Sequence, residues 1–355
     1  MKRKIYTLML AATALTFAAC NKTPDEPSTP VVNSIYWRVD PTTLEATPIL
    51  ADCGISNPYS ISVFDNLIYL TTDGGYSSNG DVVCFNLSGL KQWQAEAGIL
   101  PSKVEPYENV NTNLLAYVLN EGLWGGNNAS LGSINRYRGY MTNNVFRNAN
   151  HRSLGDVAQD VVAYGHKAYV SVTFSNTIEV IDTRNDTVIK QIRMGEGSPT
   201  ASNPRKIVPH GGKIYVSCYD PCSVVRIDTA TLQVEAICQL GTYRPEGLGV
   251  AGDKLFVAST FQIDEQSVPS YDNKVYVVDL GTFTVDSTIT VGLNPTVLKV
   301  VDGSHVAVGC VGNYADEKAS LVIINANDGS QRRATKALYN FDTDGGFIYG
   351  YESTY

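Results

Sequence analysis

Two cysteines separated by three residues are the clearest candidates for metal or redox chemistry in this chain. Cys218 and Cys222 flank the turn Tyr219-Asp220-Pro221 in the stretch "KIYVSCYDPCSVVRID". A zinc site needs about four Cys, His or carboxylate ligands, and no second pair of ligands lies nearby in the sequence. Cysteines that face each other across a hairpin turn are close enough for a disulfide. The reading is therefore a Cys218–Cys222 disulfide or two free buried thiols, with metal or redox chemistry as a third alternative.

The other residue types that support catalysis form no recognisable constellation. His166, His210 and His305 each fall in a turn between two short strands, and only His151 falls on a long loop. The chain contains no Gly-x-Ser-x-Gly and no glycine-rich phosphate loop that opens a helix. We expect no enzyme, no metal and no catalytic cofactor. A lyase or hydrolase site assembled from scattered loop residues stays open as an alternative.

The elements that position these residues repeat along the chain. A strand of alternating apolar residues that ends in Asp or Asn occurs seven times, with copies 46–51 residues apart. The closing residues are Asp40, Asn86, Asn135, Asp182, Asp228, Asp279 and Asn325. A second strand such as "KIYV" precedes most copies, and a further strand with a Gly, Asp or Asn turn precedes that one. Four short antiparallel strands with this period predict an all-β, seven-bladed β-propeller.

The phase of the repeat predicts how the ring closes. The first third-strand copy, at Asp40, has no second strand before it, and the last second strand, at Phe347, has no third strand after it. We expect N-terminal strands within residues 31–50 to pair with C-terminal strands within residues 338–355 in one shared blade. Such pairing removes free sheet edges. The predicted domain is a single propeller over residues 31–355.

The first 30 residues do not belong to this propeller. Residues 1–19 combine a basic start with an apolar stretch, which is typical of a secretory signal peptide. Because the stretch ends in Ala-Ala-Cys, it resembles a bacterial lipoprotein signal with Cys20 as the lipidated residue. The alternative is an ordinary signal peptide cut near Ala19. Residues 20–30 are rich in Pro and polar residues and predict a flexible tether, and one lipid anchors a body to a membrane surface.

The charge and hydropathy of the remaining chain exclude two classes of partner. Loss of residues 1–19 removes three of 27 basic residues and none of 35 acidic ones, which leaves a formal charge of −11. An acidic chain is a poor candidate for nucleic-acid binding. No later segment approaches 18 uninterrupted apolar residues, so we expect contact with the membrane through the lipid anchor only.

The repeat "KAYVSVTFSNTIEVIDTRNDTVIKQIRMGEGSP" resembles the YVTN-type propeller repeat of bacterial surface proteins. The layout of the whole chain is similar to the surface-exposed vitamin B12 (cobalamin)-binding lipoproteins of gut Bacteroidetes, which cap a TonB-dependent outer-membrane transporter. Asp25 and Glu26 resemble the acidic signal that directs such lipoproteins to the cell surface. The resemblance implies capture of corrinoids at the outer membrane and their passage to the transporter. The repeat is specific for the fold and says little about the ligand.

The expected ligand surface is the face where the long loops emerge, after the second and fourth strands of each blade. Among these loops we include residues 97–113 and 259–274. Large aromatics supply contact area with few rotors to freeze, and arginines can meet a phosphate. The candidate residues are Tyr59, Tyr76, Trp124, Arg152, Phe174, Arg205, Tyr219, Arg244, Phe261 and Tyr314. Some of these aromatics are expected to pack loop against loop. Glycans use the same side chains, so a surface glycan-binding lipoprotein is the runner-up.

Overall fold

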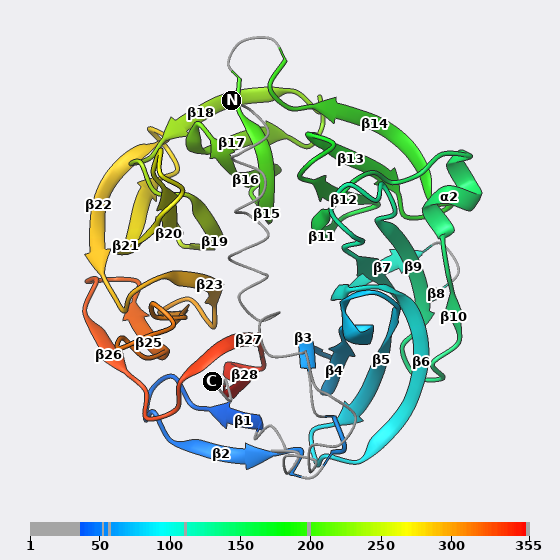
Figure 1. The fold of residues 1–355 in the computed structure, drawn as a ribbon, viewed down its shortest axis with the longest axis horizontal. Coiled ribbons are helices and arrows are strands. Elements are labelled where there is room, and N and C mark those ends of the chain that lie inside the picture. The colour runs from blue at the N-terminus through cyan, green and yellow to red at the C-terminus, as the bar shows by residue number, and fades with distance from the viewer. Residues whose placement is uncertain (1–35, 52, 56–57, 110–111, 197–199, 353–355) are drawn as a thin grey trace.

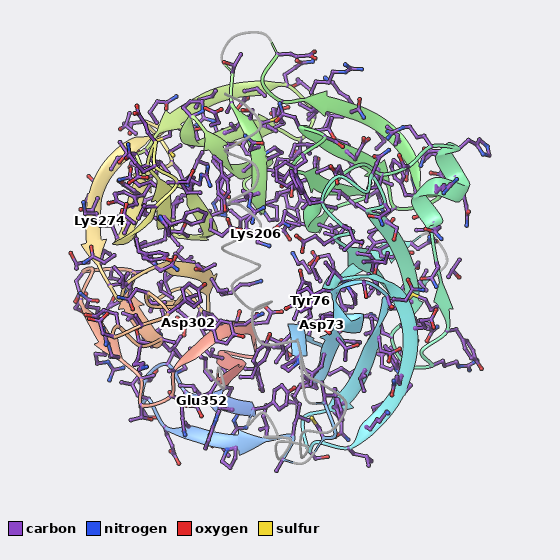
Figure 2. All side chains as sticks on the ribbon, viewed as in Figure 1. Asp73, Tyr76, Lys206, Lys274, Asp302 and Glu352 are labelled. Carbon is purple, nitrogen blue, oxygen red and sulfur yellow. The ribbon has the colours of Figure 1, made fainter. Side chains whose placement is uncertain are left out.

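The computed structural model of the protein describes residues 36–51, 53–55, 58–109, 112–196 and 200–352. These residues form seven four-stranded antiparallel sheets arranged as a ring (Figure 1). Their side chains leave the centre of the ring open in Figure 2, and we call this central space the channel. The predicted signal peptide, Cys20 and the tether lie outside the described residues. Within the described ranges, no helix has the length and apolar character needed to cross a membrane.

Each sheet is one blade, and its four strands follow one another outward from the channel. Blade 1 contains β3 (Pro58–Phe64), β4 (Leu67–Thr72), β5 (Asn79–Asn86) and β6 (Lys91–Ile99). Blade 2 contains β7 (Pro101–Asn109), β8 (Thr112–Asn120), β9 (Ser130–Asn135) and β10 (Met141–Thr142). Blade 3 contains β11 (Ala158–Tyr164), β12 (Lys167–Val172), β13 (Thr177–Asp182) and β14 (Thr187–Arg193). Blade 4 contains β15 (Ser202–His210), β16 (Lys213–Asp220), β17 (Cys222–Asp228) and β18 (Val234–Gln239).

The remaining blades follow the same order. Blade 5 contains β19 (Pro245–Ala251), β20 (Lys254–Ile263), β21 (Pro269–Asp279) and β22 (Thr284–Thr290). Blade 6 contains β23 (Pro295–Val300), β24 (His305–Cys310), β25 (Ser320–Asn325) and β26 (Gln331–Arg333). Blade 7 contains β27 (Leu338–Asp344), β28 (Phe347–Glu352), β1 (Tyr36–Val39) and β2 (Ala46–Ile49). Two short helical segments, η2 (Gly74–Tyr76) and α2 (Val145–Asn150), lie between strands.

Blade 7 confirms the predicted closure of the ring. Strand β1 pairs antiparallel with β28, with Tyr36 opposite Tyr351 and Val39 opposite Ile348. The rings of Tyr36 and Tyr351 meet edge to face at 5.7 Å. The indole N–H of Trp37 donates to the carboxylate of Glu352 at 2.9 Å. The two ends of the chain therefore hold each other through one sheet.

The hydrophobic core lies between the faces of neighbouring blades. Every residue of β13 is buried, and the second strands, such as β12, are almost entirely buried. One apolar cluster joins residues of blades 2 and 3, including Leu119 and Val170, and another joins blades 3 and 4, including Val180 and Val216. Each blade therefore stabilises the next by burying apolar area, at about 25 cal/mol per Å². The packing holds the inner strands and the loops in fixed positions.

Two of the expected long loops are strands instead. Residues 97–113 contain the end of β6, all of β7 and the start of β8, and residues 259–274 contain parts of β20 and β21. Val104 and Tyr107 are buried on β7, and their side chains pack against neighbouring blades. The loop prediction was wrong for residues 97–113 because their Pro and polar residues are typical of loops, whereas the apolar Val104 and Tyr107 among them are buried in the sheet.

Candidate functional site

Every first strand of a blade carries a β-bulge near its start, directly after the first residue in six blades and after Pro204, the third residue of β15, in blade 4. The pairing of each first strand with its second strand slips at this point in all seven blades. First strands lie closest to the centre in Figure 1 and begin on the side where the second-to-third-strand loops emerge. A bulge re-aims a side chain, so the seven bulges form an inner ring at the channel mouth. Its residues are Tyr59, Ser102, Gln159, Arg205, Glu246, Thr296 and Tyr339.

Five of the seven inner-ring residues directly follow a proline, a sequence signal that is independent of the aromatic residues used to predict the site. In four blades the first strand begins with a proline, and in blade 4 Pro204 is the third residue of β15; in all five the bulged residue directly follows the proline. Proline lacks an N–H for the sheet ladder and is therefore confined to places such as the first residue of a strand. Reading the residue after each such proline would have found Ser102, Glu246 and Thr296 in addition to Tyr59 and Arg205. Gln159 and Tyr339 do not follow a proline.

Glu121 joins three blades at the mouth. It follows β8 in blade 2, and its Oε2 accepts a hydrogen bond of 2.5 Å from the hydroxyl of Tyr59 in blade 1. Its Oε1 accepts from the side-chain amide of Gln159 in blade 3. Burial raises the pKa of the Glu121 carboxyl above its ordinary value. Tyr59 in turn meets the ring of Tyr76 edge to face at 6.2 Å, so two predicted site residues are in contact.

Arg205 and Glu246 are inner-ring residues of neighbouring blades, and they form an ion pair. Two nitrogens of the Arg205 guanidinium donate to the two carboxylate oxygens of Glu246, each at 3.0 Å. Tyr219 also donates to Glu246, and the guanidinium of Arg205 lies 4.8 Å from the centre of the Tyr219 ring. Burial opposes the charge of Glu246, but Arg205 and Lys206 more than offset it and lower its pKa. Tyr219 is 8% exposed and lies in β16, so it forms part of the floor of the mouth rather than a loop tip.

Arg244 lies beside this pair and is held by aromatic rings. Its guanidinium is 5.1 Å from the ring centres of both Tyr219 and Phe261, and these two rings meet edge to face at 6.4 Å. Its Nη1 is buried and makes no hydrogen bond within the described part of the chain. Arg244 precedes β19 and therefore lies at the mouth, next to Glu246. No carboxylate of the described residues binds its guanidinium, so its positive charge is available to a ligand.

The channel below the inner ring carries charges that are largely paired. Lys103 on β7 contacts Asp160 at 2.8 Å and Glu105 at 3.3 Å. Lys206 donates to the backbone carbonyl of Gln159 at 2.8 Å and lies close to the centre of the ring in Figure 2. Burial lowers the pKa of Lys206. The channel wall therefore combines buried charges of both signs directly beneath the mouth.

The remaining predicted aromatics, Trp124, Phe174 and Tyr314, form ring contacts that bridge neighbouring blades. Trp124 and Phe174 meet at 6.2 Å between blades 2 and 3, and Tyr271 and Tyr314 meet at 6.3 Å between blades 5 and 6. Trp124 is 45% exposed and Tyr314 is 61% exposed. Part of each ring is therefore used in packing, as expected, while another part stays open to a ligand.

Arg152 lies on the expected face of the ring but away from the channel mouth. Its guanidinium binds both carboxylate oxygens of Glu179, at 3.0 and 2.7 Å, and lies over the ring of Phe146. Glu179 lies on β13, the third strand of blade 3, and its side chain is fully buried. Arg152 therefore lies away from the first strands that form the mouth.

Of the alternatives left open for Cys218 and Cys222, the structure shows free thiols and no disulfide, because the register of the hairpin separates the two side chains. Cys218 and Cys222 are both free cysteines. Cys222 stands opposite Tyr219, and Cys218 stands opposite Ser223. Neighbouring residues of a strand point to opposite faces, so the two cysteines lie on different faces of blade 4. Cys218 packs in the core between blades 3 and 4, and within the described ranges no group of three or more His, Cys, Asp or Glu residues could hold a metal ion.

Comparison with known proteins shows the family of this chain. Residues 116–338 match the family described as Domain of unknown function (DUF5074). No curated protein matches the sequence. Among solved structures, the chain is similar to the Pan2 WD40 domain of Neurospora crassa, with 11% identity over 84% of this chain and 90% of that one and a TM-score of 0.57. It is also similar to BamB from Moraxella catarrhalis, with 13% identity over 83% and 84% of the two chains and a TM-score of 0.49. At such identities the likeness extends to the fold alone.

Proposed function

We propose that this chain, which belongs to the DUF5074 family, captures vitamin B12 and related corrinoids at the channel mouth. It acts as a binding protein and not as an enzyme. The observation that carries the proposal is the mouth itself: a ring of bulged polar residues bordered by aromatic pairs and by Arg244. The proposal further places the protein on the cell surface, lipid-anchored through Cys20 in the outer membrane, where a TonB-dependent transporter receives the ligand. This last part rests on the signal sequence and on the resemblance of the whole chain.

A corrinoid matches the chemistry of the mouth at three levels. The corrin ring is wide and flat, and the edges of Tyr76 and Phe261 offer apolar contact with few rotors to freeze. Its rim carries amide side chains that need both donors and acceptors. The inner ring supplies both, and the hydroxyl of Ser102 is buried without a hydrogen-bond partner among the described residues. A ligand that reaches Ser102 would satisfy it.

The single phosphate of cobalamin matches Arg244. Guanidinium–phosphate hydrogen bonds are among the strong ones in proteins, and Nη1 of Arg244 has no partner to give up. Arg205 is a weaker candidate for this role because Glu246 already occupies two of its donors. The phosphate is therefore expected next to Tyr219 and Phe261, with the corrin ring over the inner ring.

Calorimetry with cyanocobalamin tests the proposal most directly. The wild-type protein should bind it in a saturable manner, and Phe261→Ala should weaken the binding. His166→Ala and His210→Ala are matched controls, because these exposed histidines lie on the opposite face, His166 in the turn between β11 and β12 and His210 at the end of β15. Absence of cyanocobalamin binding, or equal loss in the histidine variants, would overturn the proposal. Consumption of cyanocobalamin during the titration would indicate an enzyme instead.

A further inference from the structure

A second cavity lies on the same face as the mouth, over blade 3. It has a volume of about 400 Å³ and is lined by residues that follow β8, precede β11, connect β12 to β13 and end β14. Arg152 and Gln191 place it over the third and fourth strands, away from the first strands. Ligand pockets have volumes of about 300–1,000 Å³. The cavity therefore suits a small ligand of one or two rings.

The charges of this cavity neutralise each other. Arg152 is bound through two nitrogens to the buried carboxylate of Glu179, which also accepts a hydrogen bond of 2.6 Å from Gln191. Arg193 and Glu196 lie 3.6 Å apart at the exposed rim. The cavity thus has no surplus charge to attract an anion or a cation. Its ligand is expected to be neutral.

The polar groups of the cavity favour a ligand rich in hydroxyls. Nine of the twelve lining residues have hydrogen-bonding side chains. Thr177 is only 7% exposed, and its hydroxyl has no hydrogen-bond partner among the described residues. A buried hydroxyl without a partner is unfavourable, and it can both donate to a ligand and accept from it. A polyhydroxylated ring supplies such partners at several positions.

An aromatic surface flanks the cavity. Asn127 and Ser175, which line it, lie close in sequence to Trp124 and directly after Phe174, and the rings of these two aromatics are in contact. Trp124 keeps 45% of its surface exposed. A pyranose ring has an apolar C–H face that can lie on an indole while its hydroxyls enter a polar cavity. We propose that this cavity is a second binding site, specific for one sugar ring of a neutral carbohydrate.

Saturation-transfer difference NMR tests this site with four probes: the methyl glycosides of glucose, galactose, mannose and N-acetylglucosamine, each at millimolar concentration. At least one should bind to the wild type. Thr177→Val keeps the shape of the side chain and removes the hydroxyl. It should therefore raise the Kd for that sugar about fivefold, which is the effect of losing one neutral hydrogen bond. Trp124→Ala should weaken it as well. Thermal melting checks that both variants are folded, and Thr177→Val should melt no lower than the wild type because its hydroxyl makes no bond in the protein.

Two controls separate this site from the corrinoid site. Arg244→Ala should leave sugar binding unchanged, and Thr177→Val should leave cyanocobalamin binding unchanged. The sugar site can therefore be supported even if the protein binds no corrinoid. The inference would be overturned if none of the four glycosides bound to the wild type. It would also be overturned if Thr177→Val and Trp124→Ala both bound the sugar as tightly as the wild type does. Loss of cyanocobalamin binding in Thr177→Val would also overturn it, because the cavity would then belong to the corrinoid site.

Discussion

Replacing Arg244 by alanine should weaken corrinoid binding while leaving the fold intact. In the structure this side chain touches the rings of Tyr219 and Phe261 and has no ion pair within the described residues. Its removal therefore leaves no buried carboxylate without a partner. That property distinguishes it from Arg205, whose removal would strand the carboxylate of Glu246.

The effect on stability follows from opposing contributions. The variant loses two cation–π contacts of about 0.5–1 kcal/mol each. It also removes a buried nitrogen without a hydrogen-bond partner, and such a group destabilises the fold by about 1–3 kcal/mol. The net change in the free energy of unfolding should stay within about 1 kcal/mol of zero. By contrast, breaking a buried ion pair by removing one partner costs about 3–5 kcal/mol, and Arg205→Ala should approach that range.

The effect on affinity should be much larger. A hydrogen bond to a charged group contributes about 1.5–3 kcal/mol, and every 1.4 kcal/mol corresponds to a tenfold change in Kd. Arg244→Ala should therefore raise the Kd for cyanocobalamin about 10- to 150-fold. The difference between wild type and variant should shrink as salt rises, because salt screens exposed charge interactions.

Calorimetry with two ligands measures this effect and identifies its origin. Cyanocobalamin carries the phosphate, whereas cobinamide is a corrinoid without the nucleotide and its phosphate. The two proteins should differ in affinity for cyanocobalamin and hardly at all for cobinamide. Unchanged affinity for cyanocobalamin would refute the reasoning. An equal loss for both ligands would show that Arg244 supports the aromatic rings and does not bind the phosphate.

Three further predictions concern the inner ring, the closure and the anchor. Burial raises the pKa of Glu121 above 4.5, so its contribution to stability is full below that value and is lost as pH rises through the raised pKa. Because glutamine does not titrate, Glu121→Gln should reduce the fall in unfolding free energy as the pH rises from 4.5 through the raised pKa. Denaturant unfolding that shows the same pH dependence in both proteins over this range would contradict this. Deleting residues 347–355 removes β28 and leaves β1 paired with β2 alone, so thermal melting should show loss of the cooperative transition. A melting curve like that of the intact chain would argue against the closure. Cys20→Ala should move the protein from the membrane fraction to the soluble fraction, and protease added to intact cells should degrade only a protein that faces outward.

The sequence by itself determined the architecture. Seven copies of one strand pattern, each ending in Asp or Asn, predicted seven blades. The pattern repeats because every blade packs its apolar residues against its neighbours in the same way. The unmatched strands near Asp40 and Phe347 predicted the shared blade, which β1 and β28 confirm. The exposed rings of Trp124 and Tyr314 also follow from their places in loops between second and third strands.

The site was predictable only in part. The sequence predicted Tyr59, Arg205 and Arg244 for the face where the structure places them at the channel mouth, but it did not identify Glu121 or Glu246. A carboxylate near a strand end has the same sequence signature whether it faces solvent or a neighbouring blade. Glu121 meets a tyrosine 62 residues away and a glutamine 38 residues away, and both contacts depend on how the blades are arranged around the channel.

Only the tertiary structure determines which residues each side chain contacts. Arg152 lies on the expected face but away from the first strands, and its guanidinium binds the buried carboxylate of Glu179 on the mostly apolar strand β13. Cys218 and Cys222 were expected to meet across their hairpin, and the register places them on opposite faces of the blade. A one-residue change of register exchanges the two faces of a strand, and bulges in the first strands shift the alternation again. The repeat therefore specifies the number and order of the strands, whereas register and the packing of neighbouring blades determine which side chains reach the channel.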